Sequence, residues 1–150
     1  MLGKVVVITG ATSGIGRIAA ERLAAQGARI VIVARDRVRA ERTLARLREI
    51  APNVMHRAHI ANLLSLAETK HVGDRITAEE PRIDVLVNNA GSIFSARAVT
   101  VDGLERTFAL NHTGLFRADP PIARAPDCFG TGAHRQYGLG RAPGPIPRFR

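Results

Sequence analysis

Short apolar runs alternate with helical periodicity along the first 116 residues. Continuous runs rich in β-branched residues, typical of strands buried on both faces, occupy residues 4–9, 29–34 and 84–87, with a weaker candidate at 53–60. Segments with apolar residues three or four positions apart occupy residues 14–26, 37–50, 64–76 and 102–116. This alternation predicts right-handed βαβ units and therefore an α/β fold with a doubly wound parallel sheet.

Each expected helix has an apolar stripe that should face this sheet. The stripes are Ile15, Ala19 and Leu23, then Ala40, Leu44 and Leu47, then Val72 and Ile76, and finally Leu104, Phe108 and Leu115. Gly27 follows the first helix as a terminating glycine. With the strands ordered 3-2-1-4, residues 84–87 lie at an open edge. Because an open edge exposes unpaired backbone groups, we expect self-association through it.

Residues 117–150 have a different composition. They contain six of the eight prolines and five glycines, and no apolar period of 2 or 3.6 continues into them. We therefore expect a folded domain over residues 1–116 and an irregular or disordered tail over residues 117–150.

The net charge is +9, from 22 basic and 13 acidic residues. A basic chain can bind nucleic acid, but here the basic residues are mostly Arg, spread along the whole chain, and aromatic residues are only 4%. A solvated basic surface is the favoured interpretation, with no nucleic-acid partner. No apolar run approaches the about 20 residues that span a bilayer, and no targeting segment is evident, so we expect a cytoplasmic protein without membrane contact. The single cysteine, Cys128, excludes an internal disulfide and a multi-cysteine metal site, and we expect no metal.

A glycine-rich turn joins the first strand to the first helix. Its candidate binding residues are Gly10, Thr12, Ser13, Gly14, Ile15 and Gly16. Glycines let the backbone approach a pyrophosphate, and the helix start offers unpaired N–H groups at the positive end of the helix dipole. An ordinary strand-to-helix turn is the alternative, but the βαβ setting favours a dinucleotide.

The sequence TGATSGIG in this turn, together with Asn88-Asn89-Ala90-Gly91, resembles the short-chain dehydrogenase/reductase family. The stretch TVDGLERTFALNHTGLF is similar to its retinol-dehydrogenase-like members. The resemblance covers about residues 3–116. It implies a Rossmann-type sheet, here truncated after about four strands, and hydride transfer between a nicotinamide and a small alcohol or carbonyl. It further implies that Asn88, Ala90 and Gly91 lie by the cofactor, with Asn88 at the adenosine ribose, and that Asn89 braces the central strands.

The cofactor preference follows from charge after the second strand. Arg35, with Arg17 after the last glycine, could clamp the 2′-phosphate of NADP, whereas Asp36 argues mildly for NAD. NADP is therefore the expected cofactor and NAD the alternative. By the resemblance, His59 stands where the family usually has an Asp that bonds adenine, so we expect His59 and Ile60 near the adenine. A purely structural His59 is the competing interpretation.

Asn111 falls on the expected stripe of the fourth helix, where a buried amide would need partners. The resemblance implies that Asn111 is a catalytic residue that supports a proton relay, and a merely structural Asn is the alternative. The family also needs a Ser, and a Tyr and a Lys four residues apart. The only Tyr here, Tyr137, is followed four residues later by Arg141, which does not give up its proton. Whether this chain is an enzyme is therefore left open, and we expect it to be inactive.

The tail also suggests its own origin. Read one base later, with free choice of synonymous codons, residues from Arg117 onward can encode a segment that resembles the family's next helix, fifth strand and catalytic Ser. We therefore hypothesise a one-base frameshift near Phe116, in the gene or in its sequencing. Three functions remain open: an NADP-dependent oxidoreductase by family, a non-catalytic NADP(H)-binding fragment and a basic nucleic-acid-binding protein.

Overall fold

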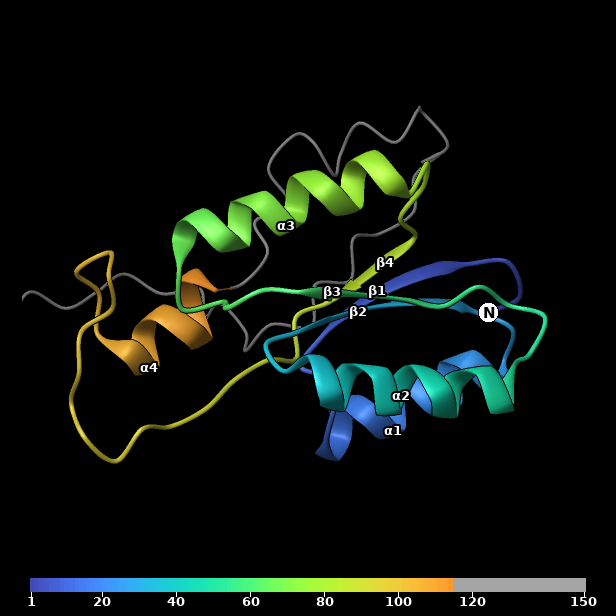
Figure 1. Ribbon diagram of the computed structural model, residues 1–150, viewed down its shortest axis with the longest axis horizontal. Helices are drawn as coiled ribbons and strands as arrows, with labels where there is room; N and C mark the ends of the chain where they lie inside the picture. Colours follow the sequence, from blue (N-terminus) through green and yellow to red (C-terminus); the bar gives the residue numbers. More distant parts are fainter. Residues whose placement is uncertain (115–150) are drawn as a thin grey trace, which may run out of the picture.

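Four parallel strands form the centre of the computed structural model, which describes residues 1–114 (Figure 1). The strands are β1 (Val5–Thr9), β2 (Arg29–Ala34), β3 (Arg57–Ile60) and β4 (Val85–Val87), ordered β3-β2-β1-β4. The helices are α1 (Gly14–Ala25), α2 (Arg37–Ile50), α3 (Leu66–Glu79) and α4 (Arg106–Phe108), which continues into a π-helical turn over Ala109–Thr113. The predicted α/β fold and strand order are confirmed. Leu115 and the predicted tail lie outside the described residues.

The sheet separates two apolar layers. Along β1 and β2, alternate side chains face opposite sides, so Val6 and Ile30 pack with α1 and α2 whereas Val7 and Val31 pack with α3. Figure 1 shows the same arrangement, with α1 and α2 on one face of the sheet and α3 on the other. Both central strands are thus covered on both faces, as their continuous apolar sequence predicts.

The predicted stripes of α2 and α3 are confirmed. Ala40, Leu44 and Leu47 of α2 are buried, as are Val72 and Ile76 of α3. Both helices begin at an N-cap side chain that accepts a backbone hydrogen bond, Asp36 for α2 and Ser65 for α3. None of the helices in the part of the chain that the structure describes could cross a membrane, because none is both long and apolar enough.

The predicted stripe of α1 is wrong in phase. Ile15 is 82% exposed, and the residues that α1 buries are Gly16, Ala20 and Ala24. These small residues are spaced four apart, so they form one face of the helix. At Gly16 the backbone of α1 lies against the side chain of Asn89, after β4, and the carbonyl oxygen of Gly10, which leaves no room for a large side chain there.

The fourth predicted helix is shorter than the expected 102–116. Residues 99–105 instead form a turn closed by a bridge between Val99 and Glu105, with Gly103 at a φ of +76°. The carboxylate of Glu105 caps the helix by accepting from the N–H groups of Thr107 and Phe108. The predicted stripe is wrong here too, because Phe108 is 49% exposed while Ala109 is buried.

Candidate functional site

The glycine turn after β1 packs directly against the segment after β4. Gly10 has a φ of +69°, and a Cβ there would lie 2.9 Å from the Cα of Ala90. A Cβ on Gly16 would lie 2.3 Å from Nδ2 of Asn89 and 2.6 Å from the carbonyl oxygen of Gly10. Glycine at these two positions is therefore a packing requirement, and it brings the start of α1 to the carboxyl end of the sheet.

Side-chain hydrogen bonds fix this junction. The hydroxyl of Thr9 accepts from the N–H groups of Asn89 and Ala90, at 3.0 and 2.9 Å. In return, Nδ2 of Asn89 donates to the carbonyl oxygens of Thr9 and Gly10, at 3.1 and 3.3 Å. These bonds tie the end of β1 to the end of β4, which is the bracing role expected of Asn89.

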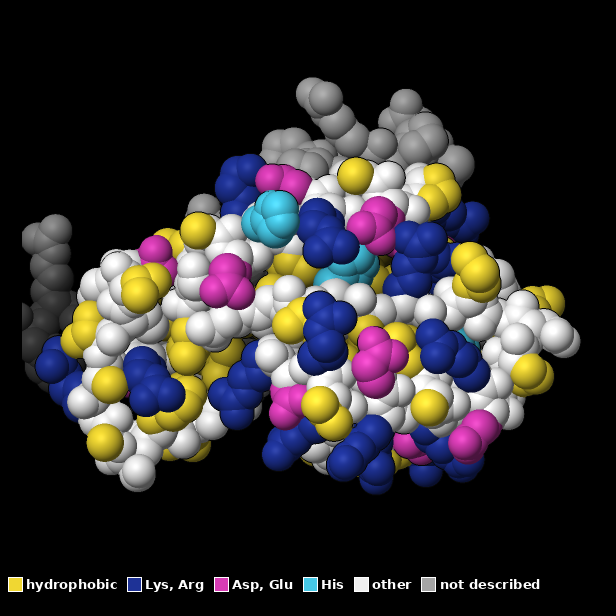
Figure 2. Space-filling view, viewed as in Figure 1, with side chains coloured by type: hydrophobic (Ala, Val, Ile, Leu, Met, Phe, Trp, Pro, Cys, Tyr) yellow, Lys and Arg dark blue, Asp and Glu magenta, His cyan; other side chains and the backbone are white. Residues whose placement is uncertain are grey.

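A cleft of about 530 Å³ opens at the carboxyl ends of the strands. Nine of the predicted cofactor-binding residues line it: Gly10, Thr12, Ser13, Gly14, Ile15, Gly16, Arg35, Ala90 and Gly91. Figure 2 shows a notch at this place, between the layer formed by α1 and α2 and the part of the chain that includes α4. Ligands of open α/β sheets bind at this end of the strands.

The start of α1 offers hydrogen-bond donors to this cleft. Ser13 is the N-cap residue, but its side chain makes no capping hydrogen bond, and the first turn of α1 contains no acidic residue. The positive end of the helix dipole is therefore not neutralised by the helix itself. The hydroxyls of Thr12 and Ser13 stand at the same place, so this end of the cleft suits a phosphate group.

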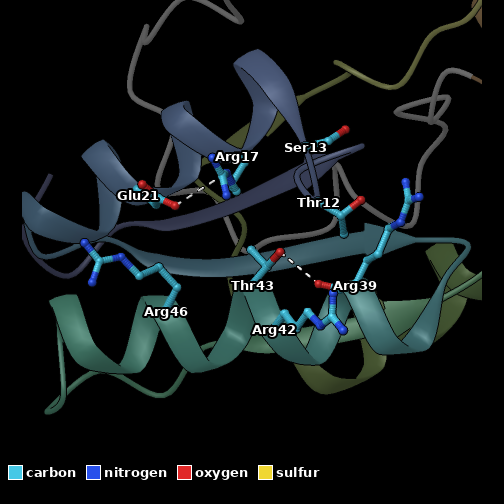
Figure 3. A pocket seen from close by; sticks show the side chains of 8 residues that line it. All are labelled: Thr12, Ser13, Arg17, Glu21, Arg39, Arg42, Thr43 and Arg46. Atoms are coloured by element: carbon cyan, nitrogen blue, oxygen red, sulfur yellow. Dashed lines mark hydrogen bonds and ion pairs between the residues drawn. The ribbon is translucent and has the colours of Figure 1, made fainter.

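The arginines divide between this cleft and a neighbouring groove. Arg35 lines the cleft, but Arg17 does not, since it lies in a separate groove between α1 and α2, where it pairs with Glu21 at 3.7 Å. Arg39 lines both, as do Thr12 and Ser13 (Figure 3). The sequence reasoning missed Arg39. Its signal was the position of Asp36 as a helix cap, which places Arg39 in the first turn of α2 beside the cleft.

Asp36 is committed to the start of α2. Its Oδ1 accepts from the N–H of Arg39 at 3.0 Å, and its Oδ2 lies 3.6 Å from Nε of Arg39. The hydrogen bond from the Arg39 N–H is the main reason that the pKa of Asp36 is lowered from its ordinary value. This carboxylate serves as a helix cap and as a partner of Arg39, which weakens the argument that it favours NAD.

His59, Ile60 and Asn88 are not among the residues that line the cleft. His59 is buried, and neither of its ring nitrogens has a hydrogen-bond partner among the described residues, while its Nε2 lies 3.8 Å from Glu79 of α3. Burial lowers the pKa of His59. The segment after β3 contributes instead Ala61, Asn62, Leu63 and Leu64 to the cleft. Asn88 is half-buried directly after β4, and its place by the ribose stays a prediction.

Asn111 holds the backbone that follows Gly91. Its Oδ1 accepts from the N–H of Ser92 at 3.0 Å, and its Nδ2 donates to the carbonyl oxygen of Ser92 at 2.9 Å. Asn111 is exposed rather than buried, which corrects the expectation from its stripe. It lies in the π-helical turn, where the N–H of Gly114 donates to the carbonyl oxygen of Ala109 at 2.6 Å. The amide thus fixes Ser92, which lines the cleft.

Known proteins are similar to this chain over most of its length. Retinol dehydrogenase 12 of Mus musculus is 39% identical over 117 residues, which cover 76% of this chain and 36% of the relative. A protein of Streptomyces sp. (strain C5), provisionally named as a daunorubicin C-13 ketoreductase, is 43% identical over 117 residues. This match covers 76% of this chain and 39% of the relative. The chain thus spans well under half the length of these relatives.

A solved structure shows the same fold. The short-chain dehydrogenase of Sphingobium yanoikuyae in complex with NADPH is 42% identical, with a TM-score of 0.67, and the match covers 80% of this chain and 47% of that one. The sequence model of the short chain dehydrogenases matches residues 4–124, which extends past the 116 expected from the motifs. With the Rossmann-type sheet and the glycine turn in place, the chain belongs to the short-chain dehydrogenase family.

Proposed function

We propose that the cleft binds a nicotinamide dinucleotide, with NADP(H) preferred over NAD(H). The observation that carries this proposal is the glycine turn, which places the uncapped start of α1 against the cleft. Gly10 and Gly16 pack the turn against Asn89 and Ala90, whereas a Cβ on Gly14 would meet open space, and the nearby N–H groups and hydroxyls suit a pyrophosphate. The NADPH complex of the related Sphingobium yanoikuyae enzyme supports the same assignment.

The preference for NADP(H) rests on Arg35 and Arg39. Both line the cleft at the end of β2 and the start of α2, where a ribose 2′-phosphate would lie in a dinucleotide-binding fold. A charge-assisted hydrogen bond contributes about 1.5–3 kcal/mol, which is roughly 10- to 100-fold in affinity. Arg17 lines the neighbouring groove and is paired with Glu21, so we assign it the smaller part of the clamp.

Calorimetric titration of the full chain with NADP⁺ and with NAD⁺ tests this proposal. Arg35→Ala and Arg39→Ala should each weaken NADP⁺ binding by roughly 10-fold or more and leave NAD⁺ binding little changed. Arg37→Ala is the matched control, because Arg37 is an exposed residue of α2 that lines neither the cleft nor the groove. Equal affinities for the two dinucleotides would contradict the clamp, and no binding of either would contradict the cofactor assignment.

Membership of the short-chain dehydrogenase family supports an oxidoreductase that interconverts an alcohol and a carbonyl. A bound nicotinamide would supply or accept the hydride. Among the described residues, Asn111 would act by holding the backbone of Ser92 at the cleft. The names of the relatives, a retinol dehydrogenase and a ketoreductase, are consistent with this substrate class.

A second candidate function is cofactor binding without turnover. The observation that favours it is the composition of the chain, whose only Tyr, Tyr137, is followed four residues later by Arg141 in a Gly-rich stretch. Both lie outside the described residues. Loss of a general acid typically costs about 10²- to 10⁴-fold in rate. We therefore expect no useful oxidation of NADPH with a panel of ketones and aldehydes, and a kcat within tenfold of an intact relative would refute this.

A further inference from the structure

The groove between α1 and α2 is a second concave site, separate from the cleft. It has a volume of about 280 Å³ and is lined by four arginines, Arg17, Arg39, Arg42 and Arg46, beside a single acidic residue, Glu21. In Figure 3 these side chains come from the two facing helices, and Figure 2 shows Lys and Arg side chains over the same layer, with Asp and Glu side chains among them. Such a lining offers many donors and few acceptors, so it suits an anion.

The α2 arginines of the groove differ in their partners, and Arg39 already pairs with Asp36 at 3.6 Å. Arg39, Arg42 and Arg46 are three and four residues apart on one helix face, where like charges destabilise a helix. Arg46 pairs with Glu49 at 2.8 Å, in an exposed ion pair of the kind that contributes little. Arg42 has no ion pair among the described residues. A bound anion would relieve this repulsion and give Arg42 a partner.

The cofactor cleft does not account for this cluster. Of the four arginines, only Arg39 also lines the cleft, while Arg42 and Arg46 lie further along α2, away from the start of α1. The hydroxyl of Thr43 donates to the carbonyl oxygen of Arg39 at 3.0 Å, so it is already used within the helix. The far end of the groove carries the guanidinium groups of Arg42 and Arg46, whose paired N–H donors match phosphate oxygens, while the carboxylate of Glu21 lies on the facing helix.

We propose that this groove binds a small, multiply charged phosphate, of which inorganic pyrophosphate is the test ligand, at Arg42 and Arg46. Because Arg39 lines both the groove and the cleft, the bound anion competes with NADP(H) for Arg39 and leaves NAD(H), which has no 2′-phosphate, unaffected. This second statement rests on the proposed function, since it requires that Arg39 contact the 2′-phosphate. The groove then makes the cofactor preference of the chain depend on the anion.

Direct titration of the full chain with sodium pyrophosphate, followed by calorimetry, tests the site itself. The chain should show saturable binding, and Arg42→Ala should weaken it by roughly 10- to 100-fold. Arg48→Ala is the control, because Arg48 is exposed on α2 outside the groove. This substitution removes the same charge as Arg42→Ala. Circular dichroism should show that both variants keep the fold. An absence of saturable binding, or an equal loss in both variants, would overturn the proposal.

Competition tests the coupling. Pyrophosphate at saturation should raise the apparent Kd for NADP⁺ and leave that for NAD⁺ unchanged, and Arg42→Ala should abolish the difference. An equal effect on both dinucleotides would overturn the coupling through Arg39. Should neither dinucleotide bind, the proposed function and the coupling both fall, whereas the first titration still decides the site. A DNA duplex that binds through Arg42 and resists displacement by pyrophosphate would overturn the assignment to a small anion.

Discussion

Gly16→Ala tests the contact on which the site is built. Gly16 has ordinary helical backbone, so the substitution introduces no strain in φ, and helix propensity alone predicts a gain of about 0.5–1 kcal/mol in stability. The structure predicts the opposite sign. The new Cβ would lie 2.3 Å from Nδ2 of Asn89 and 2.6 Å from the carbonyl oxygen of Gly10, closer than atoms can approach.

The size of the expected loss in stability follows from the groups that the new Cβ would displace. Asn89 would have to leave its two hydrogen bonds to the carbonyl oxygens of Thr9 and Gly10, each contributing about 0.5–1.5 kcal/mol. The shift of α1 away from the Gly10 carbonyl is an overpacking cost of about 1–3 kcal/mol. After the gain in helix propensity, the free energy of unfolding should fall by about 1–5 kcal/mol.

Urea unfolding followed by far-UV circular dichroism measures this free energy. Asn89→Ala serves as the second corner of a double-mutant cycle, because it removes the amide that clashes. The double variant Gly16→Ala with Asn89→Ala should be more stable than the sum of the two single losses predicts. A Gly16→Ala variant as stable as the parent chain, or losses that simply add, would refute the packing of α1 against the end of β4.

Three further outcomes follow from the structure. Burial lowers the pKa of His56 and His59, and Nδ1 of His56 accepts from the N–H of Ile30 at 3.0 Å, so protonation breaks this bond. As pH decreases, the histidines are protonated at a higher pH in the unfolded chain than in the folded one. The free energy of unfolding should therefore be constant above about pH 7 and fall as pH decreases below about 6.5. The slope should be at most about 1.4 kcal/mol per pH unit for each histidine, and denaturation curves that do not change from pH 7 to 5 would contradict this. Asn111→Ala should speed amide exchange around Ser92 with little change in global stability, and unchanged exchange there would contradict its bracing role. Size-exclusion chromatography should show concentration-dependent association through the edge at β4, and a monomer at all concentrations would contradict it.

The two central strands, β1 and β2, were predictable because each is buried on both faces. The apolar runs over β1 and β2 have no polar alternation, so a parallel sheet covered by helices is the fold that accommodates them. The stripe of α2 was equally predictable, since Ala40, Leu44 and Leu47 are spaced for one face of a helix that packs at an ordinary distance.

The phase of α1 could not be predicted from hydrophobicity. Periodicity assigns Ile15 to the buried face because it is large and apolar, but the true face is set by how closely the backbone approaches Asn89. That approach joins Gly16 to a residue more than seventy positions away in sequence, and no local pattern contains it. Small residues spaced four apart were the available signal, and they indicate close packing rather than a weak stripe.

The residues of the candidate site also differ in how far local sequence predicts them. The glycine turn and Arg35 lie within one βαβ unit, so local sequence predicts the groups that would contact the phosphates. Arg39 requires one more inference, that Asp36 caps α2 and thereby places the next turn of that helix beside the cleft. The arginine groove requires the packing of α1 on α2, which sequence periodicity did not place correctly for α1. The proposed preference for NADP(H) therefore depends on Arg35 and also on the cap of α2, which places Arg39 beside the cleft.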